Sequence, residues 1–283
     1  MSDLSVADSS ASAQDCRLCA RPTRYAFSVD VLCRPVRYFD CPHCGYVQTE
    51  APYWLSQAYS QPIADADTGI LLRNRANVAR VAAALLAIGR LRGGVLDAGG
   101  GYGILVRMLR DIGIDAHWSD KHCENLLAKG FEGADGRYDL VTAFEVLEHL
   151  EHPLEELRSL LTRSDTVLVS TELAPSTGDI TSAWWYLVPE YGQHIGFFRE
   201  SALAWAAREL GCHHATDGRS VHLLARNRAV VRRWNGLRRL PRLTSRLLRL
   251  GLRSRTMADF ESARIRMRAS LSSAAEQVKG IPR

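Results

Sequence analysis

The 283-residue sequence predicts an α/β fold in which helices cover both faces of a doubly wound, Rossmann-like sheet. Short apolar segments alternate with segments of helical spacing between residues 70 and 226. A glycine-rich turn at 98–103 follows one apolar segment and precedes a helical one, the usual order around a bound nucleotide or similar cofactor. Hydrophobic residues make up 46% of the chain, and no run of eighteen apolar residues predicts a membrane span.

The elements of this domain follow from the spacing of apolar residues. Helices are expected at 77–91, 104–112, 153–161 and 201–210, and Pro153 suits a first turn because no amide hydrogen bond is lost there. Strands are expected at 94–97, 116–119, 138–144, 166–171 and 221–225. The long segment 172–199 has no predicted helix or strand, and loops of that length in a compact domain are usually functional.

Composition divides the chain into four regions. Residues 1–15 form a polar tail, expected to be disordered, and residues 16–50 contain two cysteine pairs. The α/β domain follows at 51–226, and an Arg-rich helical extension at 227–283. The tail lacks the basic start and apolar run of a secretory signal, so a cytoplasmic location is expected, with the extension offering a peripheral contact with the inner face of the membrane.

Two Cys-x-x-Cys pairs, the first hook (Cys16 and Cys19) and the second hook (Cys41 and Cys44), predict a metal site. Four thiolates complete the tetrahedral shell of a structural zinc ion and leave no open position. A zinc-ribbon-like module of this size needs the folding energy that the metal supplies. The alternative is a set of ordinary buried cysteines, and the nearby Cys33 and His43 are interpreted as bystanders.

Asp97, Gly99 and Gly101 stand in a turn whose glycines permit a sharp bend and a close backbone approach to a ligand. A second acid, Asp120, ends the next strand 23 residues after Asp97, which suits a carboxylate that binds ribose hydroxyls. A glycine-rich turn alone does not distinguish this from a dinucleotide-binding fold.

Three stretches together resemble the class I methyltransferases, which use S-adenosylmethionine: residues 95–103, Asp120 and residues 138–150. The resemblance implies that Asp97, Gly99 and Gly101 line the cofactor and that Asp120 binds its ribose. It also implies that Phe144 and Glu145 lie beside the cofactor. The family often has an acid after a third strand to meet the adenine, but the stretch 131–137 is too short to name one.

Two groups of residues indicate the acceptor side. Glu148 and His149 lie three and four residues after Glu145, so on a helix the three side chains would share a face. The aromatic stretch 184–198 contains Tyr191 and His194 and is expected over the carboxyl edge of the sheet, where ligands bind in open α/β sheets. Stacked aromatics suit a sugar ring or a base, although the Trp residues would equally cap the core.

The two-part layout, with the hooks first and a His-x-x-Phe-Phe motif after the fifth strand, is similar to methyltransferases of bacterial polysaccharide and deoxysugar pathways. In the deoxysugar C-methyltransferases the loop carries a Tyr and a Glu-His pair. Tyr191 and His194 match that pattern and are the expected catalytic residues, but Gln193 stands where the Glu would be. This difference favours methylation of oxygen over methylation of carbon.

The Glu-x-x-Glu-His pattern also resembles metal-dependent O-methyltransferases that act on vicinal hydroxyls. The resemblance implies that Glu145, Glu148, His149 and His194 hold Mg²⁺ or another divalent ion. In relatives without a metal, Glu145 flanks the cofactor and the other two residues merely precede the next helix, so both interpretations stay open.

The net charge of +5 is local, because residues 226–256 contain eleven Arg and no acid, and without these charges the chain carries −6. The extension suits an acidic membrane surface, a phosphate-rich partner such as RNA, or an ordinary helix packed on the domain. The favoured function is methylation of a sugar hydroxyl on a small-molecule or glycan acceptor. RNA methylation, of an rRNA base or a ribose 2′-oxygen, and a non-catalytic cofactor-binding scaffold are the alternatives, and no oligomeric state is predicted.

Overall fold

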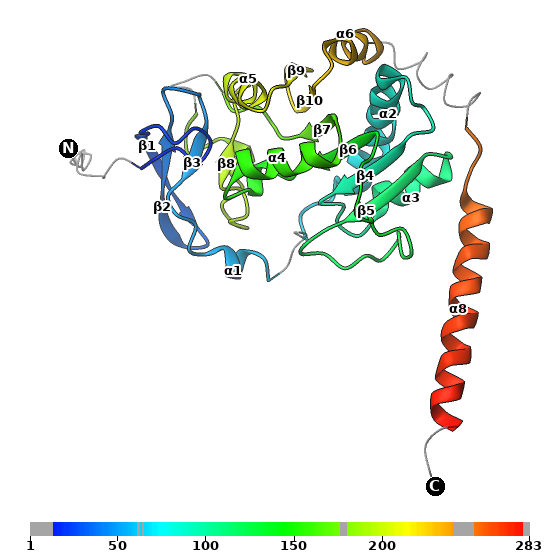
Figure 1. Cartoon of the computed structure of the whole chain (residues 1–283). Helices are drawn as coiled ribbons and strands as arrows, with labels where there is room; N and C mark the ends of the chain where they lie inside the picture. The colour runs from blue at the N-terminus through cyan, green and yellow to red at the C-terminus, as the bar shows by residue number, and fades with distance from the viewer. Residues whose placement is uncertain (1–13, 61–62, 64, 176–179, 240–251, 280–283) are drawn as a thin grey trace, which may run out of the picture.

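The computed structural model describes residues 14–60, 63, 65–175, 180–239 and 252–279, and side chains up to residue 271. Most of the expected disordered tail and the interruption expected at Pro241 lie outside the described residues. No helix in the described part of the chain has the length and apolarity required to cross a bilayer. Figure 1 shows a compact body from which the last helix projects.

A six-stranded sheet in the order β5-β4-β6-β7-β10-β9 forms the centre of the body. Its strands are β4 (Gly94–Ala98), β5 (Asp115–Ser119), β6 (Leu140–Phe144), β7 (Thr166–Ser170), β9 (His213–Thr216) and β10 (Val221–Ala225). β5, β4, β6 and β7 are parallel, whereas β10 pairs antiparallel with both β7 and β9. The doubly wound α/β prediction is therefore confirmed. Of these strands only the edge strand β9 was not expected, because its sequence, HHAT, has no apolar run.

Helices pack on both faces of this sheet. One face is covered by α4 (Pro153–Arg163) and α5 (Glu200–Glu209), the other by α2 (Ile70–Ile88), α3 (Ile104–Asp111) and α6 (Arg228–Leu237). Strand side chains alternate accordingly, since Val141 packs in the first core cluster and Leu140 in the second. Helix α2 begins seven residues before the expected start.

A second, antiparallel sheet lies at the N-terminal end, in the order β1-β2-β3-β8. Its first three strands are β1 (Arg24–Val31), β2 (Arg34–Asp40) and β3 (Val47–Thr49), and the short helix α1 (Leu55–Ala58) follows. The fourth strand, β8 (Gly196–Phe197), comes from the long segment after β7 and pairs with β3. The cysteine-containing region and the loop of the α/β domain thus share one sheet.

The C-terminal extension has two described helices. The first, α6, is packed on the domain, because Val230, Val231 and Trp234 are buried in the same core cluster as α2. The second, α8 (Thr256–Lys279), is attached near its start, where Asp259 accepts hydrogen bonds from Arg110 at 2.8 Å to each carboxylate oxygen and from Arg107 at 2.8 Å. Arg266, two turns later, also donates to the Lys129 carbonyl at 3.2 Å, and the rest of α8 projects from the body (Figure 1).

Candidate active site

The glycine-rich turn begins at the carboxyl end of β4 with a buried acid. The Asp97 side chain is 3% exposed, and its Oδ1 accepts a hydrogen bond of 2.6 Å from the Thr142 hydroxyl. Burial raises the pKa of Asp97 to about 7, against the lowering effect of the Thr142 bond. A cationic group bound nearby would therefore stabilise the ionised form of this carboxyl.

The glycines of the turn are required by geometry. Gly99 has φ +71°, and a Cβ there would lie 2.5 Å from Cγ2 of Val146. Gly103 has φ +83°, and a Cβ there would lie 2.9 Å from that of Ala128. Only glycine combines this left-handed backbone with such close neighbours, so the turn is shaped as a bare backbone cradle.

Asp120 connects the end of β5 to this cradle. Its Oδ2 accepts from the Gly101 amide at 2.9 Å, while its Oδ1 accepts from the amides of His122 at 2.7 Å and Cys123 at 2.8 Å. The Trp118 indole also donates to the Gly101 carbonyl at 2.8 Å. A carboxylate has about four acceptor positions, so Asp120 retains one for a hydroxyl. The expected cradle residues are brought together, and Phe144 and Glu145 follow at the neighbouring end of β6.

If Asp120 binds the ribose, as the resemblance implies, replacing it with alanine should weaken S-adenosylmethionine binding by roughly 1.5–3 kcal/mol through loss of a charge-assisted hydrogen bond. The Gly101 amide loses its acceptor as well, so the glycine turn also becomes less ordered. Calorimetry of Asp120→Ala beside Glu124→Ala, which changes an exposed acid, measures the effect. Equal affinities in the two variants would show that Asp120 does not bind the cofactor.

The residues after β6 form no α-helix. Glu145 has φ +53°, and the chain then makes a short 3₁₀ turn, η1 (Leu147–His149). The helical geometry considered for Glu145 and Glu148 does not occur, because the Glu145 amide is held by the Ser170 carbonyl at 3.1 Å and by the Ser170 hydroxyl at 3.0 Å, which starts the turn at the strand end. The two acids nevertheless both approach one hydroxyl, that of Tyr186.

Glu148 is the most enclosed acid of the site. Its side chain is 0% exposed, and its Oε1 accepts from the Tyr186 hydroxyl at 2.7 Å. Its second oxygen, Oε2, has no hydrogen-bond partner among the described residues. An enclosed carboxylate oxygen without a partner is costly, and a bound cation would satisfy it.

Two imidazoles complete this cluster. The Nδ1 of His149 lies 3.1 Å from the Gln193 carbonyl, and the Nδ1 of His194 lies 2.7 Å from the Tyr186 carbonyl. Since a carbonyl only accepts, both Nδ1 atoms donate, and each neutral ring keeps a free electron pair on Nε2. The ring centroids are 4.9 Å apart. Burial, together with the neighbouring His194, lowers the pKa of His149 to about 3.

One potential ligand atom each from Glu148, His149 and His194 lies within 4.8 Å of the others. Two imidazoles, each with its Nε2 directed away from a carbonyl partner, and a carboxylate form a suitable donor set for a divalent ion. Glu145 lies outside this set, although its Oε2 is 3.3 Å from the Tyr186 hydroxyl. Burial, with the charge of Glu148, raises the pKa of Glu145.

The two tyrosines of the loop differ from expectation. Tyr186, which was not singled out from the sequence, contacts both acids through its hydroxyl. Tyr191, an expected catalytic residue, is half-buried and makes no side-chain hydrogen bond among the described residues. No spacing distinguishes Tyr186 within the aromatic stretch, so only the folded loop reveals it.

The rim of the site is aromatic and contains one further cation. Trp184 packs against Phe197, with 5.3 Å between the ring centroids, and covers the core of the N-terminal sheet. Trp185, in contrast, is 66% exposed. Arg73 forms an ion pair of 2.5 Å with Asp67. That bond raises the pKa of Arg73, against the lowering effect of burial.

The two cysteine hooks meet as expected from the sequence. Sγ of Cys16 lies 3.7 Å from that of Cys44, and Sγ of Cys19 lies 3.5 Å from that of Cys41. A tetrahedral zinc ion with bonds of about 2.3 Å places its sulfurs about 3.8 Å apart. Each hook ends in a left-handed residue, Ala20 or Gly45, that turns the chain around the site. The donor set therefore fits zinc, and neither Cys33 nor His43 belongs to it.

A family model, "Methyltransferase domain", matches residues 71–215. Among solved structures, the chain is similar to magnesium protoporphyrin IX methyltransferase from Synechocystis PCC 6803 with bound SAH (19% identity, 60% of this chain, 90% of that chain, TM-score 0.39). It is also similar to an O-methyltransferase family protein from Burkholderia thailandensis (16% identity, 61% of this chain, 62% of that chain, TM-score 0.42). The comparison with curated proteins gave no match.

Proposed function

We propose that this chain, which belongs to the methyltransferase domain family and is an S-adenosylmethionine-dependent methyltransferase, methylates a hydroxyl oxygen of a sugar. The observation that supports the proposal is the cluster of Glu148, His149 and His194 near the carboxyl ends of β4 and β6, close to the glycine turn. The acceptor would be a unit of a polysaccharide, glycolipid or secondary metabolite.

The residues of the glycine turn and Asp120 would hold S-adenosylmethionine. Bound there, it supplies the methyl group and its own leaving group, so the protein has mainly to align and deprotonate the acceptor. A sugar hydroxyl is a poor nucleophile while protonated. The Nε2 of His194 is free to take that proton, because its Nδ1 is engaged with the Tyr186 carbonyl.

Glu148, His149 and His194 would alternatively hold a divalent ion, with Glu145 beside them. Such an ion lowers the pKa of a bound hydroxyl and orients two adjacent ones. The partnerless oxygen of Glu148 and the two free Nε2 atoms support this use. Vicinal hydroxyls on a sugar or a ribose are the matching acceptor class.

The position of Gln193 supports oxygen as the methylated atom. Gln193 is 7% exposed, and its side-chain amide donates to the Ala58 carbonyl at 2.9 Å. The residue at this position therefore holds α1 against the loop and offers no base to an acceptor. The exposed Trp185 supplies an aromatic face of the kind that stacks on sugar rings.

A methyl-transfer assay with isotopically labelled S-adenosylmethionine tests the proposal directly. Bacterial glycans, nucleotide sugars, glycolipids and RNA would be offered separately, and the methylated atom identified by mass spectrometry and NMR. We expect label on a sugar oxygen. Label only on RNA would favour the second candidate, and no label on any acceptor class would support a non-catalytic scaffold.

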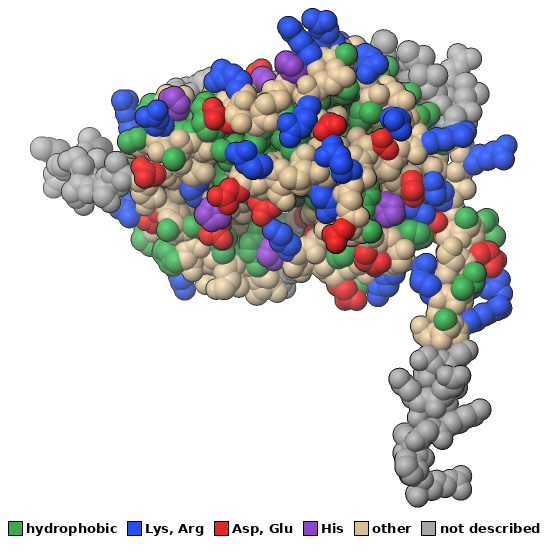
Figure 2. Space-filling model, viewed as in Figure 1, with side chains coloured by type: hydrophobic (Ala, Val, Ile, Leu, Met, Phe, Trp, Pro, Cys, Tyr) green, Lys and Arg blue, Asp and Glu red, His purple; other side chains and the backbone are tan. Residues whose placement is uncertain are grey.

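RNA methylation is the second candidate because α5, β9 and α6 together present a basic face. A shallow hollow there is lined by Arg208, Arg228 and Arg232, and an adjoining one by Arg238 and Arg239. Figure 2 shows Lys and Arg side chains gathered over α6. One acid, Glu200, also lines the adjoining hollow, whereas Asp165 pairs with Arg226 and Arg137. Anionic lipid headgroups would be attracted to it as well as phosphates of RNA.

Changing Arg228 and Arg232 together to glutamine is expected to weaken salt-sensitive binding to phosphatidylserine vesicles or to RNA by about tenfold or more, since each charge near such a surface contributes about 1 kcal/mol. Substitution is preferable to deletion of α6, because Trp234 is part of the core. The double variant Arg24→Gln and Arg34→Gln, on the exposed β1–β2 hairpin, is the control. If the wild-type protein binds neither partner, the basic face is not an interaction surface.

A further inference from the structure

Arg17 stands between the two cysteines of the first hook and directs its guanidinium into the protein. Its Nη2 donates to the Ile195 carbonyl, and also lies 3.4 Å from the Thr49 carbonyl and 3.3 Å from the Thr49 hydroxyl. Its backbone amide donates to the Gln48 side chain at 2.7 Å. One residue of the hook thus contacts both β3 and the segment that leads into β8.

Ile195, the residue after His194, is held from two sides. Its amide donates to the Glu148 carbonyl at 2.8 Å, while its carbonyl accepts from the Thr49 amide at 3.0 Å and from Arg17. The position of the Ile195 backbone, next to His194, therefore depends on contacts with the cysteine-containing region.

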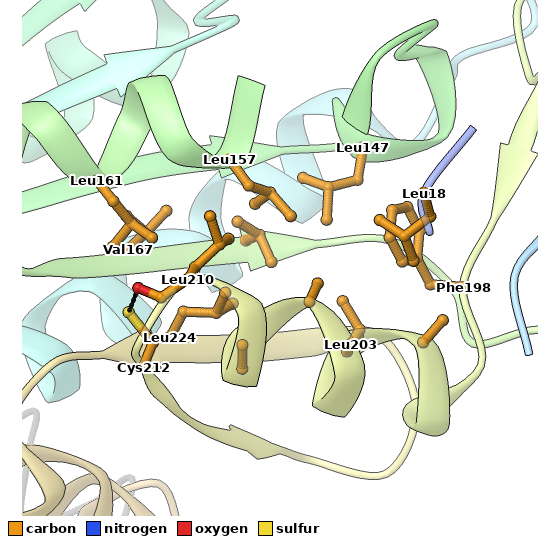
Figure 3. Packing of buried hydrophobic residues seen from close by; sticks show 14 of the residues in the cluster. Leu18, Leu147, Leu157, Leu161, Val167, Phe198, Leu203, Leu210, Cys212 and Leu224 are labelled. Atoms are coloured by element: carbon orange, nitrogen blue, oxygen red, sulfur yellow. Dashed lines mark hydrogen bonds between the residues drawn. The ribbon is translucent and has the colours of Figure 1, made fainter. Parts of the chain in front are cut away.

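Packing continues the same connection into the core. Leu18 of the first hook lies against Phe198 in Figure 3, and both belong to the buried cluster that also contains three of the four cysteines. At Gly196 a Cβ would lie 1.8 Å from the Tyr46 hydroxyl oxygen, so β8 packs directly against Tyr46, which follows the second hook. A shift of the hooks would be transmitted to β8.

Arg17 also lacks a counter-charge that the metal-loaded hooks would supply. Its Nε and Nη1 are buried without an acceptor, and it forms no ion pair with an acid in the described part of the chain. A buried guanidinium without a counter-charge is unfavourable. Four thiolates around one divalent ion carry two net negative charges, so a metal-loaded site would supply that counter-charge beside Arg17.

We propose that Arg17 is a positioning residue, through which the metal-loaded hooks hold the segment of His194 against Glu148. Loss of the metal or of the guanidinium fork releases the Ile195 carbonyl and lets His194 move relative to Glu148 and His149. Misplacement by about an ångström can lower a rate by two orders of magnitude. The inference rests on the proposed function only where it assigns a catalytic part to His194.

The test is Arg17→Lys, which keeps the charge but replaces the planar fork with a point charge. Its matched control is Arg21→Lys, at an exposed position two residues after Cys19. Hydrogen exchange followed by mass spectrometry reports on peptides covering 45–50 and 193–198, with β4 as an internal reference. We expect about tenfold faster exchange in both peptides of Arg17→Lys, with zinc content, β4 exchange and S-adenosylmethionine affinity unchanged.

Kinetics and metal removal complete the experiment. We expect kcat of Arg17→Lys to fall by about tenfold with little change in KM, and zinc-stripped wild-type protein to show the same faster exchange at 193–198 until zinc is restored. Exchange in Arg17→Lys equal to that in Arg21→Lys overturns the inference, whatever the activity. Faster exchange with an unchanged kcat would support the structural connection between Arg17 and the His194 segment. It would show that His194 has no catalytic role, which contradicts the proposed function and not the inference about Arg17.

Discussion

Replacing His194 with alanine is expected to lower the rate of methyl transfer by on the order of 10²-fold or more, while the affinity for S-adenosylmethionine stays unchanged. The residue is expected on the acceptor side of the site, where its ring lies against those of Tyr186 and His149. Both routes to a more reactive hydroxyl use the same atom, the Nε2 left free by the hydrogen bond from Nδ1 to the Tyr186 carbonyl.

Glu148→Gln separates the two routes. The amide keeps an oxygen for the Tyr186 hydroxyl but loses the charge that a divalent ion requires. If an ion is bound, this variant should lose activity as severely as His194→Ala. A chelator too weak to strip the cysteine site should then abolish turnover by the wild-type enzyme, and added Mg²⁺ or Mn²⁺ should restore it. If His194 acts as a base without a metal, neither the chelator nor added Mg²⁺ should change the rate.

The control for His194→Ala is His213→Ala, an exposed histidine on β9, which should retain full activity. Near-normal turnover by His194→Ala on the true acceptor would contradict both routes. Alignment of the acceptor by the aromatic rim would then be the main contribution of the protein to catalysis.

The sheet could be predicted from the sequence because its strands are buried on both faces and read as short apolar runs. β4, β6, β7 and β10 have this character, and each was expected within a few residues of its observed bounds. Polar β9 and the two-residue β8 have no such pattern, since both exist through pairing with partners distant in sequence. Local periodicity contains no information about that pairing.

The site shows the same limit. The resemblance of the Glu-x-x-Glu-His pattern to metal-dependent O-methyltransferases brought Glu148, His149 and His194 into one hypothesis, although the residues after β6 form a 3₁₀ turn and not an α-helix. The observed 3₁₀ turn depends on the left-handed Glu145 and its bonds to Ser170, which lies on a different strand. Tyr186 and Arg17 were missed because their importance comes from side chains that cross between regions far apart in the chain.

Changing Cys41 and Cys44 together to serine is expected to remove about one zinc ion per chain and to lower the free energy of unfolding by several kcal/mol. Structural zinc sites in small modules contribute about 10–16 kcal/mol to folding. The loss should be smaller in this protein, because the second hook also packs in the core cluster of the α/β domain. For a protein of this size, a loss of about 4 kcal/mol corresponds to a drop in Tm of about 10 °C.

Elemental analysis and thermal unfolding of the double variant measure both effects, with Cys33→Ser as the matched control. Cys33 is exposed in the turn between β1 and β2, outside the four-cysteine set, so its replacement should change neither zinc content nor Tm.

Because Leu18 and the hooks share a buried cluster with Phe198 and Leu203, unfolding should not be confined to the N-terminal sheet. The near-ultraviolet circular dichroism of the aromatic residues should therefore be lost in the same transition as the far-ultraviolet signal, at the lowered Tm of the double variant. Full retention of zinc by the double variant would show that the metal, if present, is held elsewhere, and an unchanged Tm after zinc loss would show that the two sheets are stable without it.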